Sequence, residues 1–441
     1  LWRQDMEHKI WNPRWECATR EEKNEIQLDR LKKMAAYCYE RVPFYRAKFD
    51  ETGLRPDHIR TLADVRHLPF TTADDLRNNY PFGLFAVPRK EIVRIHGSSG
   101  TTGKPKIVGY TRNDLENWTE CLARLITAAG VTSEDTTQIA FGYGLFTGGF
   151  GLHYGMERVG AMVVPLSSGN TDRQIMLMQD FGTTVLVATP SYALHLAEAI
   201  EKKGVDKSKL KLRLALFGGE GHTEEMRAKI EEALGILATE NYGLSEVGGP
   251  GVSGECYLKC GLHFAEDHFL PEIIDPDTLE PLPMGEKGEL VITTLTKEGF
   301  PMLRYRTRDI TWLMDEPCRC GRTSMRMAKV QGRTDDMMVI RGVNVFPSQI
   351  ESVIMSVKEV EPFYEIIVTT ENYLDRIEVR VEFSDASLLD DYEKLEKLRG
   401  RIRHDLKSVL NIDAKVTLVT PGTLPRFEGK SKRVIDRRDN R

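Results

Sequence analysis

The chain has 441 residues, of which 41% are hydrophobic and 29% charged, and its formal net charge is −5. This length predicts two or three domains, or one large α/β domain with a smaller one. The near balance of charge argues against nucleic acid as the main partner, because binding it requires a strongly basic field. No apolar run approaches the roughly 18 residues of a membrane span, and no cleavable leader is visible. Seven cysteines, an odd number, favour a reducing cytoplasm over a disulfide scaffold.

The first hundred residues lead toward a glycine-rich loop. Apolar residues at helical spacing over 20–48 predict an amphipathic helix. The sequence is rich in turn residues from Pro69 onward, and residues 91–95 are then expected to form a strand. A second strand is expected over 106–110, so the intervening loop joins two strands of a hairpin.

That loop reads Ser98-Ser99-Gly100-Thr101-Thr102-Gly103-Lys104-Pro105-Lys106. Glycines let backbone amides approach a polyanion, hydroxyls donate hydrogen bonds and lysine adds charge, so the composition suits phosphate binding. A Walker A loop does not fit, because Ser98 stands at its first glycine position and Pro105 follows Lys104. The alternative interpretation is a solvated hairpin loop.

Strands and helices alternate from residue 113 to residue 241. Asn113 or Asp114 is expected to cap a helix that ends at Ala129, and Thr189 to cap a later helix. The expected strands are 137–141, 161–165, 184–188, 212–217 and 237–241, and the expected helices are 172–181, 190–203 and 223–234. This rhythm predicts a mostly parallel sheet that binds ligands beyond the carboxyl ends of its strands. Glycine-rich segments follow three of these ends, at 142–149, 217–220 and 241–246.

The last third of the chain changes character twice. Residues 255–327 contain short strands and turns, with 288–294 the clearest strand, and a polar break follows at 332–336. Beyond the break, the pattern predicts a compact α+β unit whose final residues, from Pro421, are polar and basic. Its expected strands are 337–341, 364–369, 377–383 and 414–419, and its expected helices are 347–357 and 388–410. We therefore expect a large domain over 1–332 and a small one over 333–441.

Six motifs then form a recognisable series, at residues 98–106, 143–149, 242–246, 305–309, 332–336 and 425–430. In this order and spacing, they resemble the adenylate-forming acyl- and aryl-CoA ligases, and within them the phenylacetate-CoA ligase type, over nearly the whole chain. The resemblance implies a large multi-sheet α/β N-terminal domain and a small mobile α+β C-terminal domain. It also implies two half-reactions: a carboxylate attacks the α-phosphorus of ATP to give an acyl-adenylate and diphosphate, and the thiol of CoA then displaces AMP.

The resemblance also assigns residues to the nucleotide and the metal. Glu246 is expected to bind Mg²⁺, and Lys430 to bridge the acid carboxylate and the α-phosphate. Thr101 is a further catalytic candidate within the phosphate loop, formed by Ser98, Ser99, Gly100, Thr101, Thr102, Gly103 and Lys104. Tyr242 is expected to stack on adenine, and Asp309 to accept hydrogen bonds from the ribose. The remaining nucleotide-binding candidates are Gly219, Glu220, Asn241, Gly243, Ser245 and Arg333.

Each assignment has a plainer alternative. Asp309 lies among arginines and would then be an ordinary salt-bridge partner. Lys430 would belong to a solvated basic tail, and Glu246 would be a surface carboxylate. Tyr242 would be a core residue. Asp335 is the expected hinge, where a rotation exchanges Lys430 for residues 341–344 at the site, and its alternative is a polar linker.

An aromatic acid is the expected substrate. Tyr143, Gly144, Phe146 and Gly148 would form a flat slot, with glycine leaving room and the aromatic rings stacking on the substrate. This slot fits an arylacetate such as phenylacetate, while benzoate-like and indoleacetate-like acids remain open.

Soft metal ligands gather within residues 255–322. Cys256, Cys260 and His263 form a Cys-x₃-Cys-x₂-His pattern, and Cys318 and Cys320 a Cys-x-Cys pattern. Such pairs are typical of a structural Zn²⁺ site, and free cysteines in a reducing cytosol are the alternative. On the resemblance, the expected ligands are Cys256, His263, Cys318 and Cys320, with Cys260 in reserve.

These observations predict an AMP-forming aryl-CoA ligase, most directly a phenylacetate-CoA ligase, that uses ATP, Mg²⁺ and CoA. The cysteine content predicts a cytoplasmic location, and the resemblance is consistent with a homodimer. One alternative is a standalone acid-adenylating enzyme that passes the acyl group to a carrier protein or another acceptor. A second is a zinc-stabilised nucleotide-binding regulator without turnover.

Overall fold

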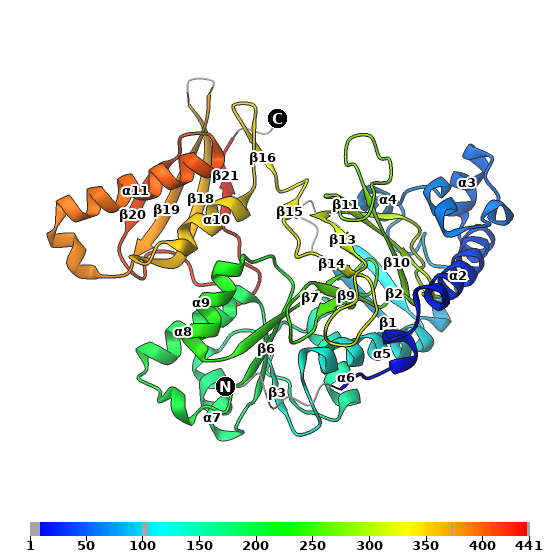
Figure 1. Ribbon diagram of the computed structural model, residues 1–441, viewed down its shortest axis with the longest axis horizontal. Helices are drawn as coiled ribbons and strands as arrows, with labels where there is room; N and C mark the ends of the chain where they lie inside the picture. Colours follow the sequence, from blue (N-terminus) through cyan, green and yellow to red (C-terminus); the bar gives the residue numbers. More distant parts are fainter. Residues whose placement is uncertain (1–8, 99–104, 372–373, 439–441) are drawn as a thin grey trace.

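The computed structural model of the protein describes residues 9–98, 105–371 and 374–438 (Figure 1). The expectations for Ser99, Gly100, Thr101, Thr102, Gly103 and Lys104 lie outside these residues. None of the helices in the described ranges combines the length and the apolar character that a bilayer crossing demands.

The N-terminal helices pack at one side of the molecule (Figure 1, blue). The single helix expected over 20–48 is in fact two, because Val42 precedes Pro43 and is extended, at φ −115° and ψ 105°. A residue before proline is disfavoured in the helical region, so the chain turns there and restarts with proline at the first helical position. The elements are α1 (Pro13–Glu16), α2 (Arg20–Arg41), α3 (Pro43–Thr52), η1 (Pro56–His58), η2 (Leu62–His67) and α4 (Ala73–Asn78).

The hairpin expected around the glycine-rich loop is present. β1 (Arg94–Ser98) pairs antiparallel with β2 (Lys106–Tyr110), and Ser98 lies opposite Lys106. The first strand begins three residues later than expected, because the 3₁₀ turn η3 (Arg89–Glu91) follows Pro88.

A nine-stranded sheet forms the centre of the molecule, in the order β13-β14-β9-β8-β7-β6-β5-β3-β4. The strands from β4 to β7 are parallel, as expected, and those from β8 outward are antiparallel. The strands are β3 (Thr136–Ile139), β4 (Met162–Val164), β5 (Val185–Ala188), β6 (Leu214–Phe217), β7 (Leu237–Leu244), β8 (Gly249–Glu255), β9 (Leu262–Phe264), β13 (Leu313–Met314) and β14 (Arg326–Met327).

The parallel strands are connected by α6 (Gly148–Val159), α7 (Thr171–Asp180), α8 (Pro190–Lys202), η4 (Lys207–Lys209) and α9 (Glu224–Leu234), and α5 (Arg112–Ala129) leads from β2 into β3. Thr189 caps α8 as expected, but the cap expected for α5 is wrong. Thr111 is the cap, and Asp114 is its reciprocal partner three residues later in a capping box. The sequence pattern missed α6, which packs so closely on α5 that a Cβ at Gly155 would lie 2.7 Å from Leu122.

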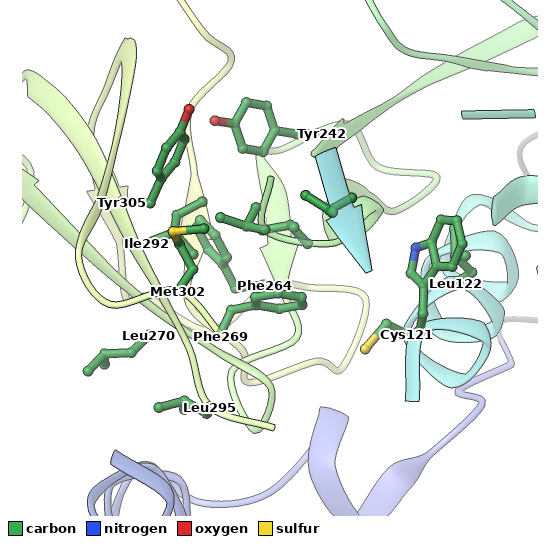
Figure 2. Packing of buried hydrophobic residues seen from close by; sticks show 14 of the residues in the cluster. Cys121, Leu122, Tyr242, Phe264, Phe269, Leu270, Ile292, Leu295, Met302 and Tyr305 are labelled. Carbon is green, nitrogen blue, oxygen red and sulfur yellow. The ribbon is translucent and has the colours of Figure 1, made fainter. Parts of the chain in front are cut away.

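A second, antiparallel sheet has the order β10-β11-β12-β15, made of β10 (Phe269–Ile274), β11 (Gly288–Thr294), β12 (Tyr305–Thr311) and β15 (Gly332–Arg333). Its apolar side chains join the main core, where Ile292, Met302 and Phe269 pack below Tyr242 and Tyr305 (Figure 2). The pairing of β12 with β15 places Arg333 opposite Asp309.

The C-terminal unit is the expected α+β structure, with a sheet in the order β20-β19-β18-β21. It lies against α8 and α9 (Figure 1, orange and red), and its buried residues share one core cluster with theirs. Two strands were not expected: β17, which is short, and β21, which lies in the basic tail and pairs with β18. The elements are β16 (Met338–Ile340), β17 (Val343–Val345), α10 (Pro347–Ser356), β18 (Val360–Glu371), β19 (Leu374–Phe383), η5 (Ala386–Asp390), α11 (Tyr392–Leu410), β20 (Lys415–Val419) and β21 (Val434–Asp436).

Candidate active site

The hairpin meets the carboxyl end of β7 at a buried ion pair. Lys106 Nζ contacts Glu246 Oε1, and Ser98 Oγ donates a longer hydrogen bond to the same oxygen at 3.4 Å. The side chain of Glu246 is only 3% exposed, so this carboxylate is not on the surface. The sequence assigned Lys106 no role, although its place at the end of the loop motif was the available signal.

The glycine-rich segment after β3 crosses the same region. Gly97 N donates to Leu145 O at 2.9 Å, which ties this segment to β1. The hydroxyls of Thr147 and Ser245 lie 3.1 Å apart, which ties it to the end of β7. Three motifs that are far apart in the sequence therefore converge beyond the carboxyl ends of the parallel strands.

Asp309 is buried between two partners. Tyr242 Oη donates to Asp309 Oδ2 at 2.6 Å, and Arg333 Nη1 donates to Asp309 Oδ1 at 3.0 Å. Burial raises the pKa of Asp309 to about 6, although Arg333 and the Tyr242 hydroxyl act in the opposite direction. A carboxylate has about four acceptor positions, so Asp309 keeps capacity for a further donor.

Arg333 links this site to the expected hinge. Its Nε and Nη2 atoms donate to the two carboxylate oxygens of Asp335, each at 2.9 Å, while Nη1 holds Asp309. The guanidinium thus spans from β12 to the first residues of the C-terminal unit. Its planar fork suits this bidentate contact.

Four of the remaining nucleotide-binding candidates have distinct local contacts. Asn241 Nδ2 donates to Phe217 O at 3.2 Å, and Gly219 has a left-handed φ of +82°. A Cβ at Gly243 would lie 1.7 Å from Gly249 O, so the bulge between β7 and β8 admits only glycine there. Glu220 is hydrogen-bonded to Ser191 and to Ser431 of the C-terminal unit.

Lys430 is exposed, but the backbone on both sides of it is held by the large domain. Thr189 Oγ1 donates to Gly429 O at 3.1 Å, and Ser431 N donates to Glu220 Oε2 at 2.7 Å. Thr189 and Glu220 follow β5 and β6. The segment that carries Lys430 is therefore docked at the carboxyl edge of the parallel strands.

The expected acid slot is only partly assembled. Tyr143 Oη hydrogen-bonds His153 Nδ1 at 2.9 Å, and its ring packs edge-on against Phe150 at 5.1 Å between centroids. Phe146 is 47% exposed, and Gly144 has a φ of +32°. A Cβ at Gly148 would lie 2.4 Å from the ring of Phe141, so close packing against that ring explains why a glycine stands at this position. The sequence missed His153 and Phe150, because α6 was not predicted.

The four expected soft ligands come together in a separate cluster of side chains. One ligand atom from each of Cys256, His263, Cys318 and Cys320 lies within 4.8 Å of every other, and all four residues are buried. Cys260 is exposed and donates to Leu258 O at 3.3 Å, outside the group.

Comparisons with known proteins define the class. The model of the AMP-binding enzyme family matches residues 53–296, and that of the AMP-binding enzyme C-terminal domain matches residues 342–438. The chain belongs to the AMP-binding, adenylate-forming enzymes.

Several individual proteins are similar to this chain over nearly its whole length. Phenylacetate-coenzyme A ligase of Thermus thermophilus is 50% identical over 443 residues, covering 97% of this chain and 100% of the relative. Phenylacetate-coenzyme A ligase of Escherichia coli is 48% identical, covering 96% and 97%. Among solved structures, 2-hydroxyisobutyryl-CoA ligase in the postadenylation state superposes with a TM-score of 0.92 at 29% identity, covering 99% and 94% of the two chains. The same ligase in the thioesterification state, with 2-HIB-AMP and CoA, gives 0.72 at 30% identity, covering 98% and 93%.

Proposed function

We propose that the chain is an AMP-forming phenylacetate-coenzyme A ligase. It joins an arylacetate to CoA, with ATP converted to AMP and diphosphate through an acyl-adenylate. Four relatives with this name, at 47–50% identity and nearly full coverage, support the activity. One structural observation supports it most directly: three groups of residues converge at one edge of the sheet. They are the Lys106–Glu246 ion pair, the hydrogen-bonded side chains of Tyr242, Asp309 and Arg333, and the docked segment that carries Lys430.

In the first half-reaction, two anions must approach each other, so the residues must offset their repulsion. Lys430 supplies a point charge between the acid carboxylate and the α-phosphate. Asp309 accepts hydrogen bonds from the ribose and keeps its orientation through Tyr242 and Arg333. Lys106 offers a further cation near the phosphates, next to Glu246.

Glu246 fits a Mg²⁺ ion held by a single carboxylate. Mg²⁺ prefers one or two carboxylates together with phosphate oxygens and water, and the second oxygen of Glu246 is not used by Lys106. When bound, Mg²⁺ would stabilise the charge that develops on the phosphoryl oxygens. Lys106 holds the Glu246 carboxylate in place for this contact.

In the second half-reaction, the C-terminal unit swings about Asp335. The contacts of Gly429 and Ser431 with the large domain must then break, which removes Lys430 and admits residues 341–344. The better superposition on the postadenylation structure, 0.92 against 0.72, supports assigning the present arrangement to the adenylation step.

The cysteine cluster is proposed as a structural Zn²⁺ site. Zn–S bonds of about 2.3 Å at tetrahedral angles place two sulfurs about 3.8 Å apart, and the Sγ atoms of Cys256 and Cys318 are 3.9 Å apart. Cys320 Sγ lies 3.6 Å from His263 Nε2, and His263 Nδ1 bonds Ser324 Oγ at 2.9 Å. That second bond fixes the imidazole with Nε2 toward the sulfurs.

Transfer to a carrier protein or another acceptor instead of CoA gains no support from these relatives. The domain boundary at 332, the homodimer and the cytoplasmic location remain predictions.

The test is a panel of phenylacetate, benzoate and indoleacetate scored for AMP release with and without CoA. We expect AMP release with phenylacetate to require CoA for sustained turnover. Equal turnover without CoA, or none with any arylacetate, would refute the proposal.

A further inference from the structure

We propose that Glu220 is a positioning residue that fixes Lys430 for adenylation, and not a nucleotide contact. The inference rests on the proposed function, since it assigns Glu220 a part in the same reaction. It replaces the sequence-based expectation that Glu220 is a nucleotide-binding residue.

Glu220 bridges two parts of the molecule with both of its oxygens. Oε1 accepts from Ser191 N at 2.7 Å, in the first turn of α8. Oε2 accepts from Ser431 N at 2.7 Å and from Ser431 Oγ at 2.8 Å. Three donors therefore occupy the carboxylate, and two of them belong to the residue that follows Lys430.

Neighbouring contacts hold the same short segment. Thr189 Oγ1 donates to Gly429 O at 3.1 Å, on the other side of Lys430, and Arg433 Nη2 donates to Ser191 Oγ at 3.2 Å. Farther along, Arg426 donates to both oxygens of Glu198 at 2.8 Å. Glu220 and Glu198 are the anionic acceptors among these contacts, and the donor to Glu220, Ser431, is the one that lies next to Lys430 in the sequence.

The arrangement has a clear physical consequence. A lysine side chain is flexible, so the place of its ammonium depends on where the backbone at residues 429–431 is fixed. Hydrogen bonds to a carboxylate are stronger than those between neutral groups, and small misplacements of a catalytic group slow a reaction strongly. Glu220 thereby acts on the rate through Lys430.

The docking also makes the effect specific to one half-reaction. The Glu220–Ser431 bonds exist only while the C-terminal unit lies as it does here, and the proposed swing breaks them. Loss of Glu220 should therefore slow adenylation and spare thioester formation. A residue needed only for folding would affect both half-reactions equally.

The experiment compares Glu220→Gln with the wild type in three assays: diphosphate release with phenylacetate, the KM for ATP, and thioester formation from presynthesised phenylacetyl-adenylate. Glutamine keeps one acceptor oxygen but presents an amide donor to the second site. We expect the adenylation kcat to fall about tenfold to a hundredfold, consistent with loss of charged hydrogen bonds. The KM for ATP and the thioester-forming rate should stay within about twofold of the wild type, and we count a difference of that size as no change.

Glu359→Gln is the matched control, because Glu359 pairs with Arg401 inside the C-terminal unit. It should leave both half-reactions unchanged. Ser431→Ala removes the hydroxyl donor to Glu220 but retains the backbone N–H donor, so we expect a smaller fall in the adenylation kcat. In the double variant with Glu220→Gln, the Ser431→Ala effect should largely vanish.

Unchanged adenylation in Glu220→Gln, or equal loss of both half-reactions, would overturn the proposal. A raised KM for ATP with an unchanged kcat would also overturn it, because that result would show that Glu220 binds the nucleotide. If Glu220→Gln does not fold, additive effects of Ser431→Ala and Thr189→Val on adenylation, with thioester formation spared, support docking of the segment. Equal loss of both half-reactions in those variants contradicts it. A wild type that releases no diphosphate with any arylacetate refutes the proposed function itself.

Discussion

Lys106 and Glu246 form a buried ion pair that joins the hairpin to the central sheet. The side chain of Lys106 is 17% exposed and that of Glu246 is 3% exposed. Removing one partner would leave the other charge uncompensated in a poorly solvated site. The pair thus couples the stability of this region to the carboxylate proposed to hold Mg²⁺.

Lys106→Met should lower the free energy of unfolding by about 3 kcal/mol, because the Glu246 carboxylate loses its buried partner. Urea denaturation measures the change. The double variant Lys106→Met/Glu246→Gln should recover most of that loss, since no charge is then left unpaired. Equal stability of Lys106→Met and the wild type would contradict this account of the pair.

Lys430→Ala should abolish adenylate formation and leave thioester formation from presynthesised adenylate largely intact. The lysine is needed only while carboxylate and phosphate approach each other. Diphosphate release and CoA-thioester formation, measured separately, test the division. Lys432→Ala is the matched control from the same basic tail, and equal loss of both half-reactions in Lys430→Ala would refute the proposed roles.

Affinity for ATP should rise with pH through about 6. Burial raises the pKa of Asp309 to about 6 in the folded protein, so its carboxyl group is protonated below that pH and is then a weaker acceptor for ribose hydroxyls. The KM for ATP, measured from pH 5 to 8 at saturating Mg²⁺, should fall across this range. Asp309→Asn should be weaker at every pH and lose the dependence, and a persistent transition near 6 would assign it to another group.

The same ionisation has a stability counterpart of defined sign. The folded protein holds the Asp309 proton more tightly than the unfolded chain, whose aspartate pKa is about 3.9. The contribution of Asp309 to stability is therefore fully present below about pH 4 and is lost as pH rises through about 6.

Zinc analysis should find one ion per chain in the wild type. Cys318→Ser should lose it and lower the Tm, because the ligand set is broken. Cys260→Ser is the matched control and should retain both zinc and Tm, since Cys260 lies outside the cluster. A wild type purified under zinc-replete conditions without zinc, with its fold intact, would contradict the structural role.

The sequence predicted the regular elements well where local signals are strong. The alternation of short apolar strands and helices located β3 to β7, and the hairpin around the glycine-rich loop followed from its two flanking strands. The helix α6 was not predicted because its sequence is rich in glycine, which disfavours a helix locally. Those glycines are needed for the close packing of α6 on α5.

Contacts between distant segments were beyond sequence patterns. The Lys106–Glu246 pair, the place of Tyr242 against Asp309 and the Glu220–Ser431 bridge all depend on tertiary arrangement. The soft ligands were the exception, because short spacing and ligand chemistry reduced the candidates to five residues and the family resemblance selected the four that come together.

The most direct test of the central claim is a single-turnover experiment with the wild-type chain, phenylacetate, ATP and Mg²⁺, in which products are quantified before and after CoA is added. We predict diphosphate and enzyme-bound phenylacetyl-adenylate before the addition, and AMP with phenylacetyl-CoA after it, in equal amounts. Formation of phenylacetyl-CoA with ADP and phosphate, or no adenylate before CoA, would contradict the account.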